Sequence, residues 1–344
     1  MSSALPASEI HLHEPCPPPG ARCTYIIYFI TGNPGLIEYY RTFLTHLYGL
    51  LTRDAPSSTV FHVFGRSLSG FEIDFASREA KLDSDDRPPY GLQEQITRSQ
   101  EALENLVRDV KNREGARDVR IILMGHSLGT YMLLEVIRRV REKAKLERDA
   151  PKIIGGVCLF ATVVDIAKSD SGRKATSLLK IGQLPRFASR LTGMLTFFIP
   201  LSFLTFLVKS VMGYPADAAH VTAAFVKSQY GVHQALHMAR DEMREMAADT
   251  WDEEIWGALS PSTHPHPRPI LRFLFAEKDH WIADETRDEL IKARGGIDGE
   301  DHKPVMEIDQ QEGWVHAFCI QQSVPVADRV YNWVRDMIIL DEAR

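Results

Sequence analysis

Residues Arg120 to Arg139 have the sequence RIILMGHSLGTYMLLEVIRR, in which an apolar run ends in Gly-His-Ser-Leu-Gly and an amphipathic run follows. The short apolar run predicts a buried strand, and the apolar spacing after the turn predicts a helix. A Gly-x-Ser-x-Gly turn between a strand and a helix is typical of a nucleophile elbow. The small residues Gly125 and Gly129 would let the backbone turn sharply and raise the hydroxyl of Ser127 above the sheet edge, at a helix N-terminus. The alternative is a tight turn without chemistry.

The rest of the chain alternates predicted strands and helices around this turn. Such alternation predicts a mostly parallel, doubly wound α/β sheet. An amphipathic helix is expected at 91–112, and a final helix at 326–339. Short apolar or β-branched runs predict strands at 24–30, 58–65, 118–125, 152–164, 268–279 and 303–309.

One segment breaks the alternation. Residues 166–261 contain no clear strand pattern and have helical character, so we expect a helical cap inserted into a single α/β core made of 24–165 and 262–344. Residues 1–23 are rich in proline and contain no signal-length apolar run, which predicts a flexible tail rather than a secretory signal.

Composition excludes some classes of function. The chain has 344 residues, 44% of them hydrophobic, and a formal net charge of −6 without a dense basic block. This balance argues against nucleic acid as a partner. The cysteines form neither a CxxC pair nor a His/Cys cluster with metal-ligand spacing. We therefore expect reduced thiols and no bound metal. The cysteines are Cys16, Cys23, Cys158 and Cys319.

A serine nucleophile needs a base and an acid that orients the base. In elbow-containing α/β folds these partners follow the serine in the order acid, then histidine. Asp279 closes a predicted strand in ILRFLFAEKD, and His316 is the histidine between the last predicted strand and the last helix. Asp165 and Asp284 remain alternatives for the acid. Among the other histidines, His126 and His280 adjoin the serine and the acid but are expected to point away.

The reaction also needs donors for a developing oxyanion. The first predicted strand ends in FITGNPGLIEYY (Phe29–Tyr40), at the position of the loop that provides one backbone N–H in such folds. We therefore assign the donors to the amides of Asn33 and Leu128, with Gly32 shaping the loop. The alternative is a plain strand–helix turn.

Four stretches together resemble the lipid droplet-associated hydrolase family of the α/β-hydrolase superfamily. They are TGNPGLIEYYRTFL, GHSLGTYMLLEVI, KDHWIAD and WVHAFCIQQS, spread from Thr31 to Ser323. The resemblance implies the α/β-hydrolase fold and carries the family's triad onto Ser127, Asp279 and His316. It also implies an ester hydrolase on lipid droplets or the cytosolic face of the endoplasmic reticulum, with sterol esters or acylglycerols as substrates.

The predicted cap contains a membrane signal of its own. Residues 191–208, LTGMLTFFIPLSFLTFLV, carry no charge, and a single helix of this length would rise about 27 Å. Pro200 in its middle favours a bent pair that dips into one leaflet over a straight span. The third alternative is a helix buried in the cap. Insertion would depend on the aromatic side chains Phe197, Phe198, Phe203 and Phe206.

These patterns predict a serine hydrolase of lipid esters that works without a metal or organic cofactor. Two alternatives stay open. One is a droplet-surface scaffold that keeps a hydrolase fold, because fold alone does not imply function. The other is acyl transfer to an alcohol by the same three residues.

Overall fold

The computed structural model describes residues 6–15, 23–56, 58–73, 87–147, 149–179, 182–257, 261–296 and 303–343. Of the predicted tail, residues 1–5 and 16–22, and with them Cys16, lie outside the described residues.

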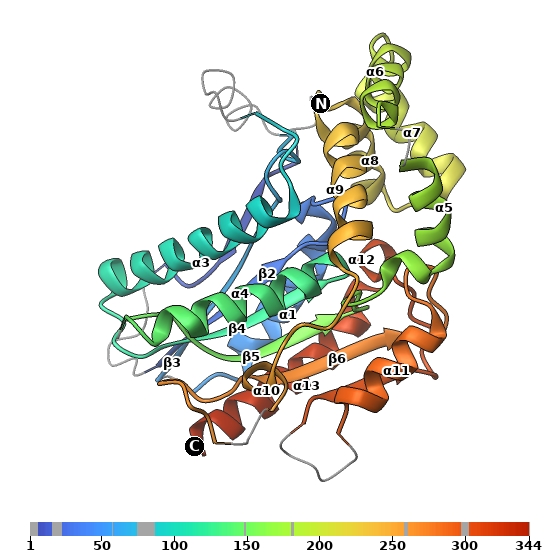
Figure 1. The fold of residues 1–344 in the computed structure, drawn as a ribbon. Helices are drawn as coiled ribbons and strands as arrows, with labels where there is room; N and C mark the ends of the chain where they lie inside the picture. The colour runs from blue at the N-terminus through green and yellow to red at the C-terminus, as the bar shows by residue number, and fades with distance from the viewer. Residues whose placement is uncertain are drawn as a thin grey trace.

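A seven-stranded sheet, mostly parallel as predicted, organises the described chain (Figure 1). Its strand order is β1-β3-β2-β4-β5-β6-β7; β1 is antiparallel to β3, and all other neighbours are parallel. The strands are β1 (Glu9–Leu12), β2 (Cys23–Ile30), β3 (Thr59–Arg66), β4 (Val119–His126), β5 (Lys152–Leu159), β6 (Ile270–Ala276) and β7 (Val305–Asp309).

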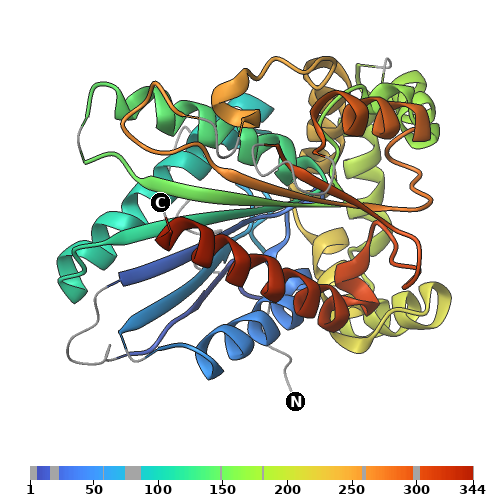
Figure 2. The same cartoon turned by 90° about the horizontal axis from the view of Figure 1, so that it is seen from below.

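Helices cover both faces of the sheet, which explains why the central strands are apolar along their whole length. α1 packs against α13 on one face, and α3 against α4 on the other, as Figures 1 and 2 show. The helices of the core are η1 (Ile37–Tyr40), α1 (Arg41–Arg53), α3 (Leu92–Glu114), α4 (Leu128–Ala144), α11 (Asp284–Arg294), α12 (Phe318–Gln321) and α13 (Ser323–Glu342).

The N-terminal segment differs from the prediction of a flexible tail. Glu9–Leu12 form β1, an edge strand with Ile10 buried to 2% exposure. Alternation of exposed and buried residues over four positions is too short a pattern to separate from a loop in a proline-rich stretch. The tail prediction is therefore wrong for these residues.

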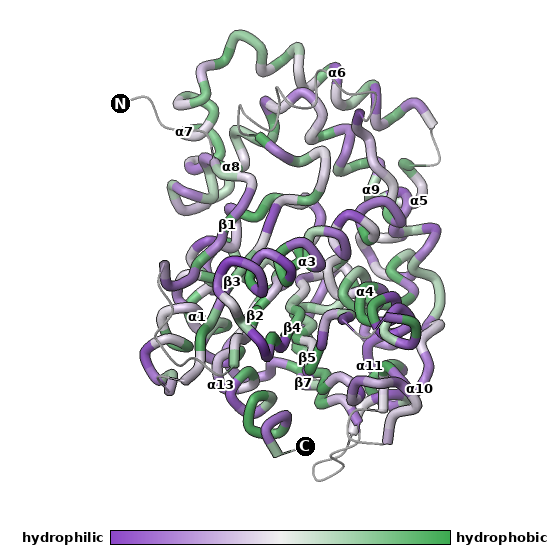
Figure 3. The backbone as a smooth tube through the Cα atoms, turned by 90° about the vertical axis from the view of Figure 1, so that its left-hand side faces the viewer, coloured by the Kyte–Doolittle hydropathy of each residue, from purple (hydrophilic) through white to green (hydrophobic). Residues whose placement is uncertain are grey.

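The predicted insertion contains helices, and its described residues contain no strand. α5 to α9 stand beyond one end of the sheet, with α6 and α7 farthest from it (Figures 1 and 3). The elements are η2 (Ile166–Lys168), α5 (Asp170–Leu179), α6 (Leu184–Thr196), α7 (Leu201–Met212), α8 (Ala216–Lys227), α9 (Gly231–Glu245) and α10 (Glu253–Trp256).

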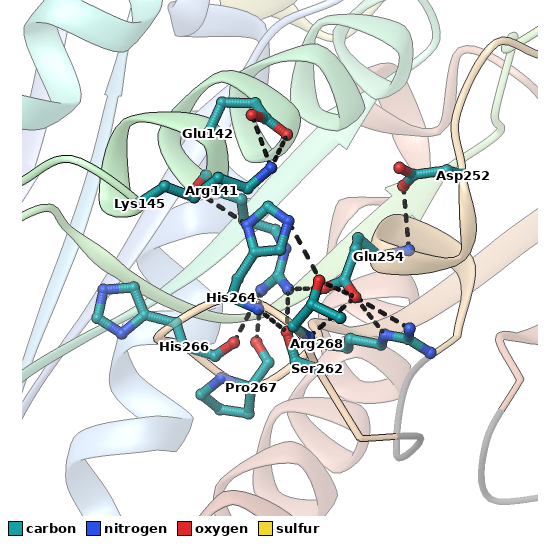
Figure 4. Close-up of polar contacts among 11 residues, drawn as sticks. Arg141, Glu142, Lys145, Asp252, Glu254, Ser262, His264, His266, Pro267 and Arg268 are labelled. Carbon is teal, nitrogen blue, oxygen red and sulfur yellow. Dashed lines mark hydrogen bonds and ion pairs between the residues drawn. The ribbon is translucent and has the colours of Figure 1, made fainter.

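A buried ion cluster fastens the chain where it returns from the cap to the sheet (Figure 4). Arg141 of α4 pairs with Glu254 of α10 and also donates to the carbonyl of Pro267, while Arg268 pairs with the other oxygen of Glu254. Burial alone would raise the pKa of Glu254. Hydrogen bonds to the carboxylate outweigh burial and hold this pKa below its ordinary value; the donors are Arg268, Ser262, the Thr263 amide and Arg141.

Candidate active site

The turn between β4 and α4 has the backbone geometry of a nucleophile elbow. Ser127 has φ 52° and ψ −124°, a conformation that is strained for a residue with a side chain. A Cβ on Gly129 would lie 2.3 Å from the Ile30 carbonyl oxygen, and one on Gly125 would lie 2.4 Å from the Gly129 carbonyl oxygen. Glycine at both positions is therefore what allows β4, the turn and α4 to pack this closely against β2.

Three side chains from separate parts of the chain meet at this turn. The Nε2 atom of His316 lies 2.9 Å from the Oγ atom of Ser127, and its Nδ1 atom lies 2.7 Å from Oδ2 of Asp279. Oδ1 of Asp279 accepts from the amide of Trp281, which fixes the carboxylate plane. The side chain of Asp279 is 1% exposed and that of His316 16%, so the imidazole is the more open of the two groups to solvent.

The other candidates for acid and base lie elsewhere. Asp165 pairs with Lys168, and Asp284 pairs with Arg287. The ring of His126 turns away from the serine, with its Nε2 atom 2.8 Å from the carbonyl oxygen of His316. The arrangement of Ser127, His316 and Asp279 thus matches the sequence-predicted set.

His126 has a role that the sequence did not indicate. Because the His316 carbonyl can only accept, Nε2 of His126 donates and its Nδ1 accepts from the hydroxyl of Tyr40, 2.7 Å away. The Tyr40 oxygen in turn accepts from the amide of Gly32. Burial, with His316 nearby, lowers the pKa of His126 well below its ordinary value, so the ring is neutral. This chain links the β2 loop, the elbow and the His316 backbone.

The loop after β2 lies against the serine. A Cβ on Gly32 would be 3.1 Å from the Cβ of Ser127 and 3.1 Å from the His126 carbonyl oxygen, so any larger residue would push the loop away from the elbow. The Gly32 amide is occupied by Tyr40, whereas the amides of Asn33 and Leu128 have no hydrogen-bond partner within the described chain. Two free backbone donors beside the serine are what an oxyanion hole requires.

A cavity of about 300 Å³ opens beside Ser127 and His316. Its size and mainly apolar lining are typical of sites for small organic molecules. The cap contributes Tyr214, Phe225, Val226 and Ala239 to its apolar wall, and the core contributes Tyr39, Trp281 and Ile320.

One carboxyl group in this cavity was not predicted. Glu242 of α9 is 4% exposed, and its Oε1 atom accepts from Nδ2 of Asn33 at 2.8 Å. Burial, reinforced by Asp241, raises the pKa of Glu242 to about 7 even though the Asn33 hydrogen bond opposes the shift. Nothing in the sequence distinguishes Glu242 from the other charged residues of an amphipathic helix. The contact ties the cap to the predicted oxyanion loop.

The apolar segment 191–208 forms a bent pair of helices at the outer tip of the cap (Figure 3). The chain bends by 110° between α6 and α7, and among the described residues no single helix is long and apolar enough to cross a membrane. Lys227 closes the bend by donating to the carbonyls of Thr196 and Ile199. The four predicted phenylalanines are 51–87% exposed, which differs from the alternative of a buried cap helix.

The parallel sheet, the elbow and the inserted helices define the α/β-hydrolase class. Solved structures agree: the peroxisomal α/β-hydrolase of Saccharomyces cerevisiae is similar over 93% of this chain and 78% of its own, with a TM-score of 0.55 at 10% identity. The 2-hydroxy-6-oxo-6-phenylhexa-2,4-dienoate hydrolase of a Rhodococcus strain is similar over 91% of both chains, with a TM-score of 0.52 at 13% identity. At these identities the likeness shows the fold alone.

Within that class, residues 23–319 match the model of the lipid-droplet associated hydrolase family, and the chain belongs to this family. The lipid droplet-associated hydrolase of Gallus gallus is 26% identical over 89% of this chain and 83% of its own. Those of Mus musculus and Dictyostelium discoideum are 24% and 22% identical, each over 90% of this chain, covering 85% and 86% of their own lengths. The resemblance predicted from four motifs is confirmed.

Proposed function

We propose that this hydrolase cleaves carboxylic esters of lipids through Ser127, His316 and Asp279. The observation that carries the proposal is the hydrogen-bond chain from Ser127 Oγ through His316 to Asp279, with lengths of 2.9 and 2.7 Å. A histidine that bridges a serine hydroxyl and a buried carboxylate is arranged to remove the serine proton. The apolar cavity beside it suits an acyl chain.

The reaction proceeds in two halves. His316 Nε2 takes the Ser127 proton as Oγ bonds to the ester carbonyl carbon, and the amides of Asn33 and Leu128 hold the oxyanion. His316 then protonates the departing alcohol as its C–O bond breaks, which leaves an acyl-enzyme. Water, deprotonated by His316, releases the fatty acid and restores the serine. Asp279 orients His316 throughout and stabilises its charged form. This scheme needs no metal or organic cofactor.

Product analysis separates the proposal from the alternatives. Purified protein and Ser127→Ala would be given emulsified triacylglycerol, diacylglycerol or cholesteryl ester, with and without a competing alcohol. Release of fatty acid by the wild type but not by Ser127→Ala supports an ester hydrolase and shows which lipid it prefers. Transfer of the acyl group mainly to the alcohol indicates a transferase. A wild type no faster than Ser127→Ala on every ester would leave the scaffold interpretation.

We also propose that α6 and α7 bind the protein to the droplet monolayer or to the cytosolic leaflet of the endoplasmic reticulum. Insertion of the exposed side chains of Phe197, Phe198, Phe203 and Phe206 would contribute roughly 4–8 kcal/mol, scaled down from the value for fully buried side chains. Tyr214, two residues beyond α7, lines the cavity. An inserted α7 would therefore hold the cavity next to the lipid.

Replacing these four phenylalanines with serine should release the protein from isolated droplets. High salt should not, because screening acts on charges and not on apolar contacts. A matched control replaces four exposed charged side chains outside α6 and α7 with serine, namely Glu101, Arg113, Glu147 and Asp336. If the variant without the four aromatic rings melts like the wild type and still sediments with droplets, another part of the protein binds the droplet.

A further inference from the structure

A second cluster of chemically reactive side chains lies at the β1 edge of the sheet. Figure 3 shows the backbone of β1, β3 and α3, the elements around it. His11 lies in β1 and His13 directly follows it, and the centroids of their rings are 4.4 Å apart. His11 is paired in register with Phe64 of β3, and His62 lies two residues away on that strand. The stacked rings of His13 and His62 have centroids 5.2 Å apart. Glu114, the last residue of α3, contacts Nε2 of His62 through its Oε2 atom.

We propose that His13, His62 and Glu114 bind a Zn²⁺ ion. One ligand atom from each residue lies within 4.8 Å of the other two. Ligands held tetrahedrally about 2.0–2.1 Å from zinc lie roughly 3.3 Å from one another. His62 Nε2 and Glu114 Oε2 are already 3.1 Å apart. His13 is exposed and directly follows the short edge strand β1, so its ring can turn to bring the third ligand atom to the ion.

The outer partners of both imidazoles favour this assignment. The Nδ1 atom of His13 donates to the carbonyl of Glu14, which leaves Nε2 unprotonated. Without metal, Nε2 of His62 donates to the carboxylate of Glu114, and zinc would replace that proton. The Nδ1 atom of His62 lies 3.1 Å from Nε2 of His11, so the ring could then carry its proton on Nδ1 and donate it to His11. Metal-binding histidines use their second nitrogen in this way, and the outer partner fixes the ring. His11 thus acts as a positioning residue for His62.

The donor set and the location indicate which ion binds and what it does. Two imidazoles and a carboxylate, with water completing four ligands, suit Zn²⁺ better than the oxygen-seeking Mg²⁺ or Ca²⁺. A cavity of about 360 Å³, lined by His11, His13 and Glu114, gives access from solvent. His62 is level with Ile121 across β2, six residues before Ser127 on β4, so the ion would lie about 20 Å from the serine. Its role would be to clip β1 to α3.

Metal binding by the full chain, purified without a histidine tag and stripped with EDTA, tests the proposal. Titration calorimetry with ZnCl₂ should show a single ion per chain, and Co²⁺ in its place should give the intense visible bands of a four-coordinate site. Glu114→Gln, which keeps a hydrogen-bond partner for His62, and His13→Ala, which changes an exposed ring, should each weaken binding at least about tenfold. Zinc should also raise the melting temperature of the wild type.

Two controls separate this site from others. His316→Ala removes the triad histidine and His46→Ala removes a surface histidine that pairs with Asp328, and both should bind zinc like the wild type. If zinc fails to bind at micromolar concentration, or if folded His13→Ala and Glu114→Gln bind it unchanged, the cluster is a hydrogen-bonded group without a metal and the proposal is overturned. Loss of binding in His316→Ala alone would place the ion at the triad and would equally overturn it.

Discussion

Glu242→Gln should make the protein more stable at neutral pH, although the residue lies in the cavity beside the proposed nucleophile. The pKa of Glu242 is raised from 4.5 to about 7 by burial, so the folded state binds its proton more tightly than the unfolded chain does. The stability due to this proton is therefore fully present below pH 4.5 and is lost as the pH rises toward 7. A shift of this size corresponds to about 3 kcal/mol at about 1.4 kcal/mol per pKa unit. Glutamine stays neutral and can still accept from Asn33.

Denaturant unfolding of the wild type and Glu242→Gln from pH 4.5 to pH 8.5 measures this difference. The two free energies of unfolding should converge near pH 4.5 and separate by about 3 kcal/mol above pH 7. Glu245→Gln, an exposed change on the same helix, is the matched control and should follow the wild type at every pH. The prediction is wrong if the difference in the free energy of unfolding between Glu242→Gln and the wild type is the same at every pH or shrinks as the pH rises. Either result would mean that the pKa of the Glu242 carboxyl is not raised by folding.

Two further predictions concern the acid of the triad and the cap anchor. Asp279→Asn should lower kcat for ester hydrolysis by about 10³–10⁴-fold, because His316 loses its orienting partner. Asp165→Asn should change kcat less than about threefold, since Asp165 pairs with an exposed lysine; the opposite ranking would move the acid to the segment between β5 and η2. Glu254→Gln should cost about 3–5 kcal/mol in the free energy of unfolding at pH 7, because it leaves Arg141 buried without its partner. Since the pKa of Glu254 is held low in the folded state, the stability that it provides is present above about pH 4.5 and is lost on acidification; a deficit that is equally large at pH 3.5 would contradict the ion-pair account.

The fold and the proposed triad were predictable because their signals are local. Gly125, Ser127 and Gly129 mark the elbow within five residues, and the chain order of acid and base then selects Asp279 and His316. Each of these residues also follows a strand whose apolar run is long enough to identify. Side chains that follow parallel strands meet at the carboxyl edge of the sheet, so few arrangements of these three residues are possible.

The features that were missed depend on contacts between distant elements. Glu242 and Asn33 are 209 positions apart, and only the packing of α9 over the β2 loop brings them together. His126 donates to His316 across 190 positions. The proposed zinc ligands come from the residue after β1, from β3 and from the end of α3, so no sequence spacing marks them. β1 itself is stabilised by pairing with β3 and not by a pattern of its own.

The most direct test of the central claim is to identify the residue that a fluorophosphonate modifies. The reagent bonds to a serine only where a base activates it, so the wild type should carry the phosphonate on the peptide that contains Ser127. Ser127→Ala should carry none, and His316→Ala should react far more slowly while melting like the wild type. If Ser127→Ala is still labelled, for example at buried Ser67, which accepts a hydrogen bond from the Ile37 amide, then Ser127 is not the nucleophile and the account is wrong.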